Sequence, residues 1–220
     1  MGHISRMLDL PGHPELDKQI LIGKCLRLQL RADPEAIRRE VSSLPVSTWD
    51  TTGGRIGVHK AAQAVFLRGY APAEGNKPIE PRPVLEQLPY IRHLIESVIP
   101  AQVQRCLLAR LPAQTRIAPH IDQAPYFAKT LRVHVPVETN EQVWMICQNE
   151  AFHMSPGEIW LINNSNVHAV CNDNATQARI HLICDFLPSP ALLQLLAAAE
   201  RARGVSAESV SSGLRLSEAG

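Results

Sequence analysis

Short segments that alternate between apolar and polar residues dominate the second half of the chain. Pro, Gly and Asn separate these segments, so each one is predicted to be a short β-strand. The predicted strands are residues 103–111, 129–137, 142–147, 158–162, 168–171 and 178–186. Many short strands at close spacing, preceded by helical patterns, predict a mostly β fold of the sandwich or jelly-roll type with helices packed outside it.

The first half of the chain mixes strand and helix patterns. Residues 21–30 are an apolar run with basic interruptions, which predicts a strand. Asp33 followed by Pro34 is typical of a helix start, and the helix is predicted to continue through Ser43. A second strand is expected over residues 64–70. These elements form an N-terminal α/β unit ahead of the main fold.

Prolines determine the elements predicted over residues 71–99. Residues 71–83 are rich in proline and are predicted to form a surface loop. Residues 84–99 have apolar positions at helical spacing, which predicts one amphipathic helix, or two short helices kinked at Pro89.

The two ends of the chain carry no predicted chemistry. Residues 1–20 are interpreted as an N-terminal extension, and residues 21–188 as one β-rich domain that includes the α/β unit. Ser189 and Pro190 begin a predicted C-terminal helix over residues 189–204. Residues 205–220 are rich in Ser and Glu and have little apolar surface, so a disordered tail is expected.

Composition and charge exclude several classes of partner. The chain has 220 residues, of which 45% are hydrophobic, enough for one sizeable core. Its 22 basic residues nearly balance its 21 acidic residues, with no dense basic run, so no nucleic-acid or membrane partner is expected. No apolar stretch approaches a membrane span and no secretory leader is evident, so a cytoplasmic location is predicted. The 5 cysteines are predicted to be buried, reduced thiols.

Three residues predict a metal site. His120 and Asp122 are two apart, so on an extended strand both side chains face the same side. His168 can complete a set of two histidines and one carboxylate. This ligand set leaves open positions on the metal and is the one that iron(II) oxygenases use.

Two further pairs are expected to face the same interior. Arg179 and His181 share one face of a strand, as do Arg132 and His134, and apolar residues alternate with them. A buried arginine is costly unless it is paired, which indicates an anionic ligand such as a dicarboxylate. For Arg132 and His134 the alternative is a buried hydrogen-bonded network or an ion pair with Glu138 or Glu158.

These motifs resemble a known family. Residues from about Trp49 to Phe186 are similar to the aspartyl/asparaginyl β-hydroxylase-like branch of the 2-oxoglutarate-dependent dioxygenases, which includes bacterial free-proline cis-hydroxylases. The matching motifs are Pro119-His120-Ile121-Asp122, Leu131-Arg132-Val133-His134-Val135, Phe152-His153-Met154, Gly157-Glu158-Ile159-Trp160, Val167-His168 and Ala178-Arg179-Ile180-His181-Leu182 with Asp185.

The resemblance implies a double-stranded β-helix, or cupin-like jelly roll, with flanking helices. It implies catalytic iron(II) held by His120, Asp122 and His168, with 2-oxoglutarate and dioxygen as co-substrates. It also implies that Arg179 binds the distal carboxylate of 2-oxoglutarate and that Arg132 and His134 help to hold this co-substrate. The presence of Asp122 argues against a halogenase and places the chain nearer to the bacterial small-molecule hydroxylases than to the animal aspartyl hydroxylase.

The resemblance further implies hydroxylation of a C–H bond. The substrate is expected to be a free or carrier-bound amino acid, with proline first and aspartate or asparagine next, contacted by His59 and Arg68. A surface salt bridge is the alternative for Arg68. Other functions stay open: a peptidyl aspartyl/asparaginyl hydroxylase, a zinc or manganese enzyme of cupin type, or a non-catalytic binding or sensor module. A homodimer is also left open.

Overall fold

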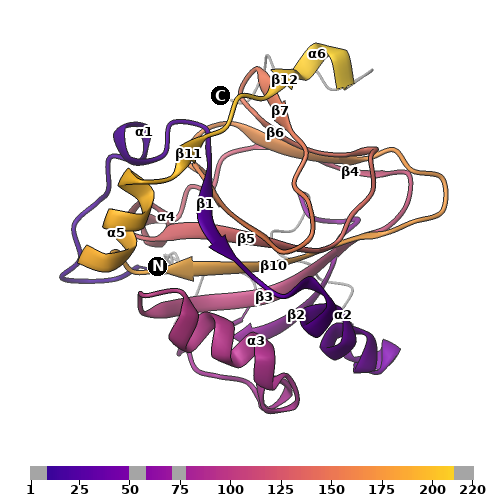
Figure 1. Cartoon of the computed structure of the whole chain (residues 1–220), viewed down its shortest axis with the longest axis horizontal. Helices are drawn as coiled ribbons and strands as arrows, with labels where there is room; N and C mark the ends of the chain where they lie inside the picture. The colour runs from indigo at the N-terminus through magenta and orange to yellow at the C-terminus, as the bar shows by residue number, and fades with distance from the viewer. Residues whose placement is uncertain (1–8, 50–57, 71–77, 211–220) are drawn as a thin grey trace, which may run out of the picture.

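Two antiparallel sheets stack on each other to form the body of the protein. The computed structural model describes residues 9–49, 58–70 and 78–210. Within these residues the larger sheet has seven strands, ordered β11 (Glu200–Arg201), β1 (Cys25–Arg31), β8 (Glu158–Ile162), β5 (Leu131–Glu138), β10 (Arg179–Phe186), β3 (Val103–Leu111) and β2 (Gln63–Arg68). The smaller sheet has five, ordered β12 (Val205–Ser206), β7 (Glu150–Phe152), β6 (Val143–Cys147), β9 (His168–Asn172) and β4 (Thr115–His120). The fold is a jelly roll of the predicted double-stranded β-helix class, as Figure 1 shows.

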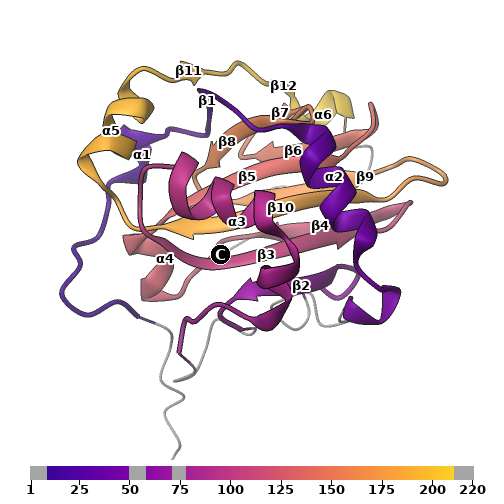
Figure 2. The same ribbon diagram turned by 60° about the horizontal axis from the view of Figure 1, so that its bottom comes forward.

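Helices cover the outer face of the larger sheet. The helix α2 (Pro34–Ser43) starts where predicted, because the Asp33 carboxylate accepts hydrogen bonds from the first turn. Figure 2 shows α2 and α3 (Pro89–His93) crossing in front of this sheet. Their buried side chains join those of the sheet in one large apolar cluster, which includes Ile37 and Ile91.

Alternation along the central strands divides this apolar layer from a polar interior. Leu131, Val133 and Val135 of β5 are fully buried in the outer cluster, and Leu182 of β10 joins them. The residues between them face the space between the two sheets. The predicted alternation is confirmed, and it places the polar side chains of both strands in the interior.

The segment over residues 83–98 is broken into short helices. In place of one helix over residues 84–99, the chain forms η2 (Pro83–Gln87), α3 and a π-helical turn, η3 (Leu94–Val98). The break falls at Leu88, which leaves helical geometry at φ −124° and ψ 65°. Pro89 causes this break, because proline disfavours helical geometry in the residue before it. The predicted loop 71–83 lies largely outside the described residues.

The C-terminal helix is shorter than predicted. Helix α5 (Pro190–Ala197) begins at the Ser189 cap, but the prediction that it extends to residue 204 is wrong. Residues 200–201 instead pair with β1, and residues 205–206 pair with β7. Backbone pairing at two sheet edges therefore replaces the last helical turns.

The start of the predicted tail is ordered. Strand β12 leads into the helical turn α6 (Ala207–Val210), and Ala207 is buried against the smaller sheet. Edge pairing and this small apolar contact compensate for the ordering entropy over residues 205–210. Residues 211–220 lie outside the described residues.

Several of the described elements were not predicted, among them β4, which carries His120. Helix α1 (Lys18–Leu21) precedes β1, α4 (Pro125–Lys129) follows β4, and β7 forms a hairpin with β6. All five cysteines are buried and free, as predicted. No helix among the described residues is long and apolar enough to cross a membrane.

Candidate metal centre

The three predicted metal ligands converge between the sheets. His120 on β4 and His168 on β9 are directly opposite each other as cross-strand partners. Asp122 lies just beyond the end of β4, where its backbone N–H donates to the Asn164 carbonyl at 3.1 Å. One ligand atom from each of the three side chains lies within 4.8 Å of the other two. Neighbouring strand ends therefore assemble the set that the sequence pattern predicts.

Hydrogen bonds orient both imidazoles for metal binding. His120 Nδ1 lies 2.8 Å from the Ala118 carbonyl oxygen, and His168 Nδ1 lies 2.9 Å from the Asn166 carbonyl oxygen. Because a carbonyl only accepts, each Nδ1 carries the proton and the lone pair is on Nε2. Burial lowers the pKa of His168 to about 4, so this imidazole is neutral near pH 7. Both rings thus present a nitrogen donor to a cation.

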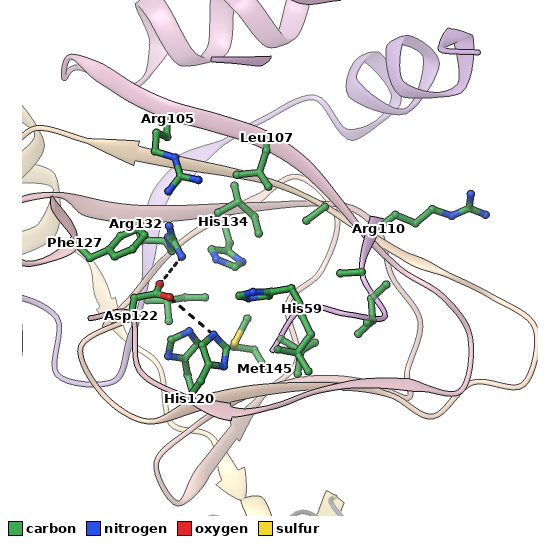
Figure 3. A pocket seen from close by; sticks show the side chains of 18 of the residues that line it. His59, Arg105, Leu107, Arg110, His120, Asp122, Phe127, Arg132, His134 and Met145 are labelled. Carbon is green, nitrogen blue, oxygen red and sulfur yellow. Dashed lines mark hydrogen bonds and ion pairs between the residues drawn. The ribbon is translucent and has the colours of Figure 1, made fainter. Parts of the chain in front are cut away.

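Asp122 is held by a polar network that sequence reasoning identified only in part. Its Oδ2 accepts from Arg132 Nη1 at 2.5 Å and from Asn164 Nδ2 at 2.9 Å. Burial opposes ionisation of Asp122, but the neighbouring positive charge and hydrogen bonds prevail and keep its pKa below the ordinary value. Figure 3 shows Arg132 reaching this carboxylate. Asp122 is therefore an oriented anion.

Arg132 also grips a second carboxylate. Its Nε and Nη2 donate to the two oxygens of Asp185, at 2.8 and 3.0 Å. The alternative of an ion pair with Glu138 or Glu158 is wrong, since Glu158 instead lies 3.1 Å from Arg27. Arg132 thus binds Asp122 and Asp185, and its contact with a co-substrate stays a prediction.

A lysine from the predicted N-terminal extension supports the same network. Lys18 is 3% exposed, and its Nζ donates to Asn164 Oδ1 at 2.5 Å. Burial lowers the pKa of this lysine to about 8. Nothing in the local sequence indicates this role, because the contact spans most of the chain.

A cavity of about 200 Å³ opens beside the ligands and extends to Arg179. Arg179 is 2% exposed, and its Nη2 lies 2.6 Å from His181 Nδ1. Its buried Nε has no hydrogen-bond partner among the described residues. Burial also lowers its pKa to about 9, so an anion in the cavity would stabilise its charged form. His134 lines the same cavity, and its Nδ1 is 3.4 Å from His181 Nδ1.

Of the two predicted substrate contacts, His59 lies in the cavity and Arg68 lies outside it. His59 lines the cavity, with its ring centroid 5.0 Å from that of His120. Arg68 does not line the cavity: it donates to the Gln104 carbonyl and lies 3.9 Å from Glu96. A register shift after Phe66 pairs Arg68 with a residue of the outer apolar cluster, and this turns its side chain away from the interior. The prediction that Arg68 faces the substrate is therefore not supported by its position, and the salt-bridge alternative fits better.

The buried histidines predict acid sensitivity. An unfolded histidine has a pKa near 6.5, whereas burial holds that of His168 at about 4 and those of His134 and His181 well below 6.5. Below pH 6.5 the unfolded chain therefore binds protons that the folded chain does not, so stability falls as the pH drops toward 4. His168 alone should remove about 2 kcal/mol of stability between pH 7 and pH 5, and His134 and His181 should act in the same direction. Urea unfolding of the metal-free protein at both pH values tests this, and equal midpoints would contradict it.

The sequence of the chain is similar to those of known hydroxylases. A family model described as aspartyl/asparaginyl β-hydroxylase matches residues 33–188. An L-proline cis-4-hydroxylase of Rhizobium meliloti (strain 1021) is 29% identical over 112 residues, which cover 50% of this chain and 40% of that protein. The match thus spans about two fifths of the length of this curated relative.

Solved structures of similar shape share little sequence with the chain. A 2OG-Fe(II) oxygenase family protein from Burkholderia pseudomallei is 11% identical, with a TM-score of 0.48 and coverage of 79% of this chain and 80% of that one. A prolyl hydroxylase from Trichoplax adhaerens, in complex with a hypoxia inducible factor peptide, is 13% identical, with a TM-score of 0.48 and coverage of 83% and 89%. HygX from Streptomyces hygroscopicus, with nickel and 2-oxoglutarate bound, is 12% identical, with a TM-score of 0.44 and coverage of 71% and 78%.

Proposed function

The chain belongs to the aspartyl/asparaginyl β-hydroxylase family, and from this premise we propose that it is an iron(II)- and 2-oxoglutarate-dependent dioxygenase that hydroxylates a C–H bond of a small substrate. One observation carries the proposal. The cluster of His120, Asp122 and His168 opens onto the same cavity as a buried arginine, Arg179, whose Nε has no hydrogen-bond partner in the described part of the chain. A metal site alone would not need this cation in the interior.

The donor chemistry of the cluster fits iron(II). Two neutral imidazoles and one ionised carboxylate match the ligand set of the non-haem iron oxygenases. Zinc and manganese enzymes can use the same donors, but they do not need a buried arginine in the same cavity. The arginine therefore favours an oxygenase that binds a dicarboxylate.

The reaction balances with three reactants and three products. 2-Oxoglutarate, dioxygen and the substrate are converted to succinate, carbon dioxide and the hydroxylated product, with one oxygen atom in succinate and one in the product. Iron(II) held by the cluster would supply the activation of dioxygen that this chemistry requires.

The residues of the chain bind and orient the reactants. We assign the distal carboxylate of 2-oxoglutarate to Arg179, with His134 as a further contact in the same cavity. Apolar side chains such as Ile117, Met145 and Val170 line the wall and limit the entry of water. Arg132 and Asn164 hold Asp122 in one orientation, which keeps the ligand set in place before the metal binds.

A small amino acid, free or carrier-bound, is the proposed substrate. The cavity of about 200 Å³ accommodates a small molecule beside 2-oxoglutarate, and the proline hydroxylase relative supports proline as the first candidate. Aspartate and asparagine come next. A peptidyl substrate is the competing proposal within the same family.

Succinate release tests the proposal directly. The protein is incubated with iron(II), 2-oxoglutarate and oxygen, alone and with each free amino acid, and succinate and product mass are measured. At least one amino acid should raise succinate above the uncoupled background and gain one oxygen atom. If only a peptide or folded protein does so, the substrate class is wrong. If neither succinate nor 2-oxoglutarate consumption is detected with any substrate, the oxygenase proposal fails.

A further inference from the structure

A second arginine in the cavity has no anionic partner among the described residues and no assigned role. Arg105 on β3 lines the cavity and is 6% exposed. Its side chain makes no hydrogen bond or ion pair with any described residue, and its Nε is fully enclosed. Leaving a guanidinium buried and unpaired is costly, so an anionic ligand in the cavity would stabilise Arg105.

Arg105 and Arg179 lie at opposite ends of the same face. Every second residue of β3 lines the cavity, namely Arg105, Leu107, Ala109 and Leu111. Leu111 is the cross-strand partner of Arg179. Six residues of strand separate Arg105 from that position, which is about 20 Å of backbone. One anion at Arg179 therefore cannot also satisfy Arg105 unless it spans the whole cavity.

The end that holds Arg105 is also the end next to the metal ligands. Figure 3 shows its guanidinium turned toward the interior, above Phe127 and the Arg132–Asp122 pair. Asp185 is the leading source of negative charge at Arg105, but both oxygens of this carboxylate already accept from Arg132. Among the described residues, the positive charge of Arg105 therefore has no carboxylate of its own.

Aromatic rings surround the same guanidinium. Its Cζ lies 5.8 Å from the ring centroid of Phe66 and 5.9 Å from those of Tyr126 and Phe127. Phe66 and Phe127 also line the cavity, so they offer an apolar surface beside the cation. This combination suits a ligand with a carboxylate at one end and a hydrocarbon part next to it.

We propose that Arg105 binds the carboxylate of the substrate and so selects a free carboxylic acid over its amide or its peptide-linked form. The proposal rests on the proposed function, because it takes Arg179 as the site of the co-substrate. It replaces Arg68, which lies outside the cavity, as the substrate-binding arginine. It also favours a free amino acid over a carrier-bound one, in which the carboxylate is esterified.

Binding without turnover tests this assignment. Wild type, Arg105→Gln and Arg116→Gln are loaded with manganese(II) and 2-oxoglutarate, and the free L-amino acids and their carboxamides are titrated by calorimetry. Arg116 is the control, because it does not line the cavity and forms a partly exposed ion pair with Asp173. Thermal melts verify that each variant is folded.

The expected result is a loss of selectivity. Wild type should bind at least one amino acid tenfold or more tighter than its carboxamide. Arg105→Gln should weaken the acid by about 20-fold and change the amide by less than twofold, as expected for the loss of one charge-assisted contact. The affinity for 2-oxoglutarate should be unchanged, and Arg116→Gln should behave like wild type.

Several outcomes would overturn the proposal. Equal binding by wild type and Arg105→Gln would do so, as would a wild type that does not discriminate acid from amide or that binds no member of the panel. Loss of selectivity in Arg68→Gln but not in Arg105→Gln would return the role to Arg68. If Arg105→Gln does not fold, Arg105→Lys is measured instead. Its preference for the acid over the carboxamide should fall severalfold, and a preference equal to that of wild type would refute the assignment. If wild type binds manganese but not 2-oxoglutarate, it is the proposed function that fails.

Discussion

Replacing His168 with alanine is expected to abolish iron binding and turnover while the domain stays folded. His168 contributes one of the three donors of this cluster, and because its Nδ1 bonds to the Asn166 carbonyl, its Nε2 is the atom available to a metal. Because the loss of even a supporting contact costs about 10- to 100-fold in metal affinity or activity, loss of a ligand should cost more than about 100-fold. Metal content after dialysis and the rate of succinate release measure the two effects.

Two other variants sharpen this experiment. His93→Ala removes an exposed histidine on α3 and should leave iron content unchanged. Asp122→Gly deletes the carboxylate ligand and should also inactivate the protein, although it leaves Arg132 with only Asp185 as its partner. Iron content and activity close to wild type in His168→Ala would remove the assignment.

Replacing Arg179 with alanine is expected to weaken 2-oxoglutarate binding strongly. A buried, charge-assisted bidentate contact is worth about 2 to 4 kcal/mol, so the dissociation constant should rise by about 30-fold or more. Arg179→Lys keeps the charge but loses the planar fork, and it should recover only part of the affinity. Calorimetry with 2-oxoglutarate and the manganese(II) form measures this without turnover.

A surface arginine provides the control for Arg179. Arg116 forms a partly exposed ion pair with Asp173 away from the cavity, and Arg116→Ala should bind 2-oxoglutarate like wild type. Because Arg179 is fully enclosed, its removal also creates a void, so metal binding must be verified in the same sample. Unchanged 2-oxoglutarate affinity in Arg179→Ala would show that the arginine is structural.

Much of the fold was predictable from alternation and capping. The strands over residues 103–111 and 158–162 have the predicted bounds, and α2 matches its prediction because Asp33 and Pro34 are a strong local start signal. The C-terminal helix was overestimated for the opposite reason. Its Ala- and Leu-rich sequence favours helix, but pairing of residues 200–201 with β1 is a tertiary contact that local propensity does not register.

The candidate site divides in the same way. The convergence of His120, Asp122 and His168 followed from strand periodicity, which is a local property. The contacts of Lys18 with Asn164 and of Arg132 with Asp185 join residues that are far apart in sequence. From the sequence alone, both Lys18 and Arg132 could equally have been surface residues. Arg68 was misplaced because a single register shift reverses the face of a strand, and that shift leaves no local signal in its sequence.

Arg105 illustrates what strand periodicity could have indicated. It shares one face of β3 with Leu107 and Ala109, so the period of the strand could have placed it in the interior, although it was not among the predicted site residues. Its lack of a partner, however, depends on Arg132 already occupying Asp185, and only the assembled structure shows this.

Binding of 2-oxoglutarate to the wild-type protein with and without metal tests the central claim most directly. The metal-free protein is titrated with 2-oxoglutarate by calorimetry under exclusion of oxygen, before and after addition of one equivalent of iron(II). The account predicts one iron per chain and 2-oxoglutarate binding at one site, which tightens strongly once iron is present because the cavity joins the ligand cluster to Arg179. Iron binding without any binding of 2-oxoglutarate, or 2-oxoglutarate binding that does not depend on the metal, would contradict it.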